Sequence, residues 1–274
     1  KLFRQITLPT ISITLRFLLP LLCFFSVGAQ NYVSPRKASA GLTIAVEIKE
    51  KKDLDYIQKN LYKFYGVQFI RVNGNVDIEK VSRVIELLDD VDDVQLINFS
   101  GDFNEEVIDR LDWVNNITIF LKNGKEDQVL MTSNIGRLRK LTLIFEIAPT
   151  DYSFLESLTQ VRKLHLVAPF VKKEARAAVA AVSSLKYLED FGISLDKIPD
   201  LPMEIRKIQN LKALTIYDNL SWITEKYLEN LSVWHQNIEY AVGEKTRYID
   251  FRYNALDVDL TPYDYNHIYT VFRH

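Results

Sequence analysis

Two hexapeptides, LRKLTL at residues 138–143 and VRKLHL at residues 161–166, decide the fold of this 274-residue chain. Each has an apolar residue at its first, fourth and sixth positions, and each is followed by a return segment. The alternation of apolar and polar residues toward the end of each hexapeptide is the period of a β-strand. A strand that recurs at the interval from Leu138 to Val161 is typical of a repeat with one strand and one return segment in each unit.

The same pattern extends along most of the chain. Eight units of similar length begin at Gly41, Phe64, Val91, Val114, Leu138, Val161, Leu188 and Leu211. The fourth and sixth positions of each unit are predicted to point into the core, for example Ile44 and Val46 in the first unit and Val67 and Phe69 in the second. This periodicity predicts a solenoid of short parallel strands.

The return segments carry a helical pattern. Apolar residues recur at the spacing of one helix face over residues 53–65 and 77–88, and residues 174–185 are rich in Ala. We expect Asp53, Asp77 and Asn104 to be N-caps and Gly66 to stop a helix, because these residue types are preferred at those positions. The shorter units have room only for a short helix or a 3₁₀ turn.

The stretch Leu201–Asn219, LPMEIRKIQNLKALTIYDN, resembles the consensus LPxxIxxLxxLxxLxLxxN of the leucine-rich repeat family. Residues 246–256, TRYIDFRYNAL, are similar to it. The resemblance, to members of the bacterial secreted type, implies an α/β horseshoe with a parallel sheet on its concave face and helices or 3₁₀ turns on its convex face. The consensus Asn is replaced elsewhere, so we expect irregular turns after Phe99, Lys122, Glu146, Pro169 and Asp196.

The period fails near the C-terminus, where two registers compete. One places a strand at residues 238–242, and the other places a strand at 248–253 after a long helix over 222–234. We expect both strands, the second as part of a closing cap, because a solenoid needs an element that covers the end of its core. Residues 257–274 are either the rest of this cap or the start of a further region.

Residues 1–29 have the features of a secretory signal peptide. They contain Lys1, Arg4 and Arg16, an apolar run from Phe17 to Val27, and no acidic residue. We expect cleavage after Ala29; an uncleaved anchor, or a lipid-modified Cys23, is the alternative. Cleavage would remove the only Cys and leave a formal net charge of −5, so no disulfide could hold the mature chain. The apolar run is too short for an ordinary transmembrane helix, and no second run of membrane length follows.

The predicted organisation is therefore a signal peptide at 1–29, a linker at 30–40, a repeat array at 41–245 and a C-terminal repeat or cap at 246–274. The expected location is secreted, periplasmic or at the cell surface.

The sequence contains no catalytic, nucleotide-binding or metal-binding motif that we can identify. Its four His residues lack metal-ligand spacing, and His165 is expected to be an ordinary surface residue. The aspartates at 89, 90, 92 and 93 are interpreted as a solvated turn, with a Ca²⁺ site as the alternative. We expect no cofactor, no catalytic residue and no metal. The net charge of −2 and the absence of an evident basic patch argue against a nucleic-acid partner.

What remains is a surface for a protein partner. The outward seventh positions of the units form an apolar row, in which we expect the binding residues Ile70, Ile97, Phe120, Ile144, Val167 and Tyr217. Apolar patches on soluble proteins often mark contacts. The alternatives are that the row satisfies only β-propensity or is covered by the C-terminal tail. Competing functions are an accessory domain of a larger enzyme that continues beyond residue 274, or self-association in an adhesion or structural role.

Overall fold

The computed structural model describes residues 32–40, 43–122, 126–195, 198, 202–211, 213–217 and 248–252, and for residues 127, 206, 213–217 and 248–252 it describes only the backbone. Nine strands in these ranges form one sheet in chain order, and all neighbouring pairs are parallel. They are β1 (Ala45–Ile48), β2 (Phe69–Asp77), β3 (Asp93–Ser100), β4 (Asn116–Leu121), β5 (Lys140–Phe145), β6 (Lys163–Val167), β7 (Asp190–Ser194), β8 (Ala213–Tyr217) and β9 (Tyr248–Arg252).

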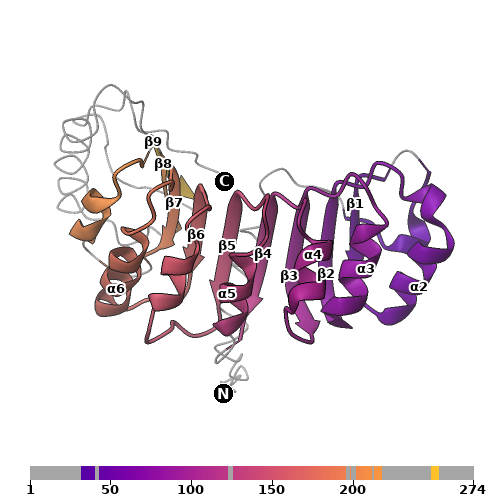
Figure 1. Ribbon diagram of the computed structural model, residues 1–274, viewed down its shortest axis with the longest axis horizontal. Coiled ribbons are helices and arrows are strands. Elements are labelled where there is room, and N and C mark those ends of the chain that lie inside the picture. The colour runs from indigo at the N-terminus through magenta and orange to yellow at the C-terminus, as the bar shows by residue number, and fades with distance from the viewer. Residues whose placement is uncertain are drawn as a thin grey trace, which may run out of the picture.

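The return segments pack on one face of this sheet (Figure 1). They contain the helices α2 (Lys51–Lys59), α3 (Ile78–Glu86), α4 (Glu105–Arg110), α5 (Asp127–Thr132) and α6 (Lys172–Val182). The 3₁₀ turns are η1 (Pro35–Lys37), η2 (Leu61–Lys63), η3 (Ser153–Ser157) and η4 (Met203–Lys207). The longest of these helices, α6, lies in the unit that runs from Val161 to Leu188, where the sequence has most room for it.

Two inward rows of aliphatic and aromatic side chains run across the strands and form the core with the helices. The first row is Val46, Ile70, Val94, Ile117, Leu141, Leu164 and Phe191, and the second is Ile48, Val72, Leu96, Ile119, Leu143, Leu166 and Ile193. All of these residues are buried. The chain therefore has the predicted α/β leucine-rich repeat fold, with the sheet on the concave face and the helices on the convex face.

The prediction for the first two units was wrong in register. Val46 and Ile48 face the core in β1, and Ile70 and Val72 face it in β2, whereas Ile44 is exposed and Phe69 is half-buried on the opposite face. Phe64 misled the pattern, because it is buried in the return segment and not at the start of the unit. Gly66, with φ of 84°, turns the chain before Val67, which is where the second unit begins.

Two of the three predicted N-caps are confirmed. The Asp77 carboxylate accepts a hydrogen bond from Glu79 N (3.0 Å), and Asn104 Oδ1 accepts one from Val107 N (2.9 Å). Asp53 is not a cap, since α2 begins two residues earlier. Its Oδ2 instead accepts hydrogen bonds from the backbone N–H groups of Lys49 (3.0 Å) and Glu50 (3.1 Å). A carboxylate at the third helical position can reach back to the start of the helix in this way.

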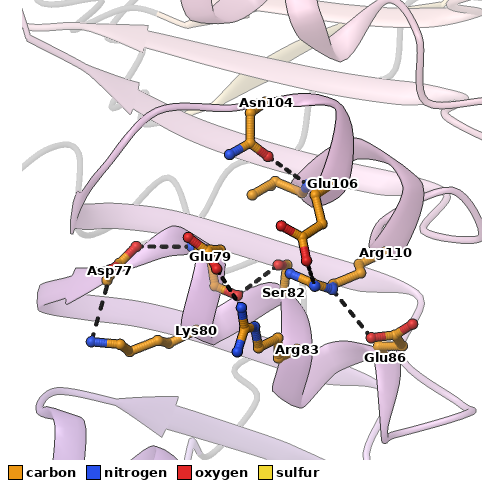
Figure 2. A network of polar contacts seen from close by, with 10 residues as sticks. Asp77, Glu79, Lys80, Ser82, Arg83, Glu86, Asn104, Glu106 and Arg110 are labelled. Atoms are coloured by element: carbon orange, nitrogen blue, oxygen red, sulfur yellow. Dashed lines mark hydrogen bonds and ion pairs between the residues drawn. The ribbon is translucent and has the colours of Figure 1, made fainter.

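Ion pairs on the convex face connect neighbouring helices (Figure 2). Arg83 pairs with Glu79 one turn away on α3. Arg110 on α4 pairs with Glu106 on the same helix and with Glu86 at the end of α3, at 3.3 Å from Arg110 Nε. These carboxylates and cations neutralise each other, and we assign them a structural role.

Several sequence expectations lie outside the described residues. They are the signal peptide at 1–29, the helix at 222–234, the strand at 238–242 and the tail at 257–274. The second expected C-terminal strand is confirmed as β9, which pairs directly with β8.

Candidate functional site

The candidate site is the concave face of the sheet, where side chains alternate with those of the core. Three rows cross the strands on this face. The first row is Ala45, Phe69, Asp93, Asn116, Lys140, Lys163 and Asp190, and the middle row is Glu47, Arg71, Gln95, Thr118, Thr142, His165 and Gly192. The last row contains Phe120, Ile144 and Val167 in register on β4, β5 and β6, and Ser194 and Tyr217 in register on β7 and β8.

Ile70 does not belong to this surface. It is 0% exposed and aligned with Val46 and Val94 in the core, so its predicted outward orientation was wrong. The cause is the shift of the second unit from Phe64 to Val67, because an odd shift in a strand moves a side chain to the opposite face. Arg71, between the inward residues Ile70 and Val72, stands on the concave face.

The remaining apolar residues are brought together but differ in exposure. Ile97, which follows the inward Leu96, and Phe120 are half-buried. Ile144 is 1% exposed and Val167 is 6% exposed, although neither belongs to the core cluster on the other side of the sheet. Tyr217 is paired with Ser194 in the sheet, and its side chain lies outside the described part. Phe120, Ile144 and Val167 therefore lie on this face as predicted, whereas Ile97 lies at an irregularity between β2 and β3, where Asn98 is the register partner of Asn73.

His165 is buried, so its prediction as an ordinary surface residue was wrong. It is 4% exposed, and its Nε2 lies 3.5 Å from Asp190 Oδ1 on the neighbouring strand. Burial raises the pKa of Asp190, but His165, Lys163 and Lys140 oppose this, and the net pKa lies below the ordinary value. This contact joins His165 of the middle row to Asp190 of the first row across β6 and β7.

A polar network covers the beginning of the concave face. Arg71 Nε donates a hydrogen bond to Gln95 Oε1 (3.0 Å), and its guanidinium carbon lies 3.9 Å from the centre of the Tyr32 ring. Asn73 Nδ2 donates to Glu47 Oε1 (3.2 Å). The backbone brings Tyr32 here, because Val33 forms a parallel bridge with Val46.

Two groups in this region have strongly raised pKa values. Burial raises the pKa of Tyr32 to about 12, against the lowering effect of Arg71. Burial also raises the pKa of Asp93 to about 6, helped by Asp92 and opposed by Lys140, Gln95 and Arg71. The sequence pattern did not indicate Tyr32 or Arg71 as residues of this face. The pattern Val67, Ile70 and Val72, which has the same spacing as the later units, was the signal that would have placed Arg71.

In the predicted aspartate turn at residues 89–93, the Asp92 carboxylate has a structural role. Asp92 Oδ1 accepts a hydrogen bond from Asn115 Nδ2 (2.5 Å), and Asp92 Oδ2 accepts one from Asn116 Nδ2 (2.9 Å). In the part of the chain that the structure describes, no three His, Cys, Asp or Glu side chains are grouped so that they could hold a metal ion. None of the described helices has the length and apolar character needed to cross a membrane.

Comparisons with known proteins gave structural matches only. No protein-family model matches the sequence, and no curated protein matches it. The crystal structure of an internalin from Listeria monocytogenes matches with a TM-score of 0.38 and 13% identity, over 86% of this chain and 61% of the internalin. The crystal structure of a TLR13–ssRNA13 complex matches with a TM-score of 0.39 and 15% identity, over 60% of this chain and 24% of that chain. The matched part is less than two thirds of either of those proteins.

Proposed function

We propose that this chain is a non-catalytic binding module, secreted or exposed at the cell envelope, that binds a protein partner across its concave sheet. The observation that carries the proposal is the apolar set Phe120, Ile144 and Val167, which lie in register on the sheet face opposite the core. Protein interfaces combine such an apolar centre with a polar rim. The half-buried Thr118 and Thr142 beside this set supply part of that rim.

Phe120 is the residue through which the proposal is best tested. It is the largest member of the set and is only half-buried, so a charged side chain at this position can reach water. Ile144 is less suitable, because a charge introduced at a 1% exposed position would destabilise the fold by itself.

The test is affinity capture of a partner with the wild-type protein, followed by measurement of direct binding by calorimetry. Phe120→Glu should weaken binding at least about tenfold, because truncating or charging a central interface residue costs on the order of 2 kcal/mol. Leu130→Glu is the matched control, since it makes the same kind of change at an exposed apolar residue of α5 on the opposite face. Equal binding by the wild type and Phe120→Glu would place the partner elsewhere.

Export is a separate part of the proposal. It rests on the basic, apolar and small-residue order of residues 1–29, which is the pattern of a cleaved signal. N-terminal sequencing of the protein from its native source should begin at or within a few residues of Gln30. Retention of Lys1 in a membrane-bound product would support the anchor instead.

A further inference from the structure

Five cationic residues converge at the start of two neighbouring strands, a place that we call the basic edge. It consists of Arg137 and Arg139 just before β5, Lys140 at the start of β5, Arg162 just before β6, and Lys163 at the start of β6. All except Lys140 are exposed. These residues are not evident as a basic patch in the sequence, because they form two short groups in successive repeat units. The repeat brings the groups together.

The backbone fixes this convergence. Lys140 and Lys163 are register partners in the sheet. The Arg139 carbonyl accepts hydrogen bonds from the backbone N–H groups of Arg162 (3.0 Å) and Lys163 (2.9 Å). Adjacent strands lie about 4.8 Å apart, so the five positive charges share a small area. Like charges that face each other across neighbouring strands are unfavourable, and the fold keeps them here.

Ion pairs with described residues neutralise only part of the basic edge, although Lys140 and Lys163 also lower the pKa of the Asp190 carboxyl group. Arg162 lies 3.6 Å from Glu189, but Arg137, Arg139 and Lys163 form no ion pair with any described residue. Among the described residues elsewhere, exposed arginines lie close to carboxylates. Arg83 pairs with Glu79, and Arg176 pairs with Glu204 at 2.7 Å. The Asp112 carboxylate, next to the basic edge, accepts a hydrogen bond from Gly136 N (2.7 Å).

The surroundings of the basic edge limit what it can bind. Carboxylates lie on both sides, Asp92 and Asp93 at β3 and Glu189 and Asp190 at β7. The whole chain has a formal charge of −2. A long polyanion would therefore meet repulsion on either side of the basic edge, whereas a few carboxylates fit within it. Guanidinium groups bind carboxylates through two parallel hydrogen bonds, which favours this ligand further.

We infer that the basic edge receives a short acidic segment of the protein partner. The inference rests on the proposed function, because Lys140 and Lys163 stand in the first concave row, beside the middle-row residues Thr142 and His165. A partner that covers the concave sheet would thus place its acidic segment at the ends of β5 and β6. Electrostatic contacts of this kind set the orientation and association rate of a complex.

The probe for this inference is a fluorescein-labelled decapeptide of alternating Glu and Gly, with binding followed by fluorescence anisotropy at low salt. The double variant Arg139→Glu/Lys163→Glu should bind the peptide at least about tenfold more weakly than the wild type. The double variant Lys51→Glu/Lys59→Glu is the matched control. It makes the same change of net charge at two exposed residues of α2, and its affinity should change less than about twofold.

Thermal melts show whether each variant is folded. If the charge reversal unfolds the protein, the neutral variant Arg139→Gln/Lys163→Gln replaces it and should also bind the peptide more weakly than the wild type. Equal weakening in both Glu double variants, or no binding by the wild type, would overturn the inference. So would tighter binding of a DNA oligonucleotide of equal charge that is lost in the same variant, because the basic edge would then be a nucleic-acid site.

Failure of this inference differs from failure of the proposed function. Phe120→Glu should leave peptide binding within about twofold, since Phe120 lies in the last row and not at the strand starts. Suppose that Phe120→Glu abolishes binding of the captured partner but Arg139→Glu/Lys163→Glu does not. Protein binding on the concave sheet is then supported, and the inference of an acidic segment at the basic edge is wrong. If the peptide binds as expected but Phe120→Glu does not weaken binding of the partner, the basic edge binds acidic peptides and the proposed site around Phe120 is wrong.

Discussion

The beginning and the middle of the concave face use one backbone for two different surfaces. At β1 to β3, polar side chains satisfy one another, as in the contacts of Arg71 with Gln95 and Tyr32 and of Asn73 with Glu47. At β4 to β6, the last row is apolar, and β5 and β6 begin at the cations of the basic edge. The inward rows are alike in both regions. The repeat therefore fixes the fold through its inward positions and leaves the outward positions free to differ.

The largest expected effect tests whether the two regions share one core. Ile70→Ala in β2 and Leu164→Ala in β6 should each lower the free energy of unfolding by roughly 2 to 5 kcal/mol, through lost transfer energy and a residual cavity. Both residues are fully buried in the same inward row. Urea unfolding measures the loss, and Thr142→Ala on the concave face is the control with little expected effect. A silent Ile70→Ala would restore the outward orientation that the sequence predicted.

The next effect is specific to the first region, where two backbones approach closely. A Cβ atom at Gly74 would lie 1.7 Å from the Lys49 carbonyl oxygen, so Gly74→Ala requires the backbone to move. We expect a loss of roughly 1 to 3 kcal/mol, as is usual for overpacking.

Gly66→Ala is the comparison for Gly74→Ala, because it introduces backbone strain without a steric clash. Gly66 has φ of +84° and no atom within 4 Å of the added Cβ, so Ala should cost only about 1 to 2 kcal/mol there. Urea unfolding of both variants gives the comparison. If Gly74→Ala is tolerated better than Gly66→Ala, the close approach of β2 to the end of β1 is not rigid.

A third effect uses pH to compare the regions. The folded pKa of Asp93, raised to about 6, lies above its ordinary value of 3.8. The folded protein thus holds a proton that the unfolded chain has lost between about pH 4 and pH 6, and stability falls as the pH rises through this window. Asp93→Asn should remove this fall and stabilise the protein at pH 7 by on the order of 2 kcal/mol.

Asp190, at the start of β7 beside the middle region, supplies the contrast, because its folded pKa is lowered. Its contribution to the free energy of unfolding is present at pH values above the ordinary pKa, and it is lost as the pH falls through the lowered pKa. Urea unfolding as a function of pH should therefore show the two effects with opposite sign. A wild-type profile that is flat between pH 4 and pH 6, and unchanged by Asp93→Asn, would contradict the assignment for Asp93.

The smallest effects are expected at exposed ion pairs, one in each region. Lys49 pairs with Glu47 at 3.0 Å, and Arg162 lies 3.6 Å from Glu189. Lys49→Ala and Arg162→Ala should each change the free energy of unfolding by less than about 1 kcal/mol, since exposed pairs contribute little. A larger loss for Arg162→Ala would mean that the basic edge has a structural role in addition to the binding role inferred for it.

The sequence by itself determined the repeat, the parallel strands from the third unit onward and the caps at Asp77 and Asn104. These features depend on contacts within one unit or on a period that many units share. The first two units were misread because Phe64, Val67 and Phe69 also match the pattern, and only pairing with β3 selects Val67, Ile70 and Val72. A period of two gives each strand two possible faces, and hydrogen bonds to the neighbouring strand decide between them.

Only the tertiary structure decided which outward residues meet. Tyr32 reaches Arg71 because Val33 bridges to β1, and His165 is buried beside Asp190 although its place in the strand predicted exposure. Ile144 and Val167 share a row with Phe120 but are less exposed. The basic edge depends on groups from two successive units, and neither unit contains it alone. Exposure and charge pairing are properties of adjacent units, so they follow from register between strands and not from the composition of any one repeat.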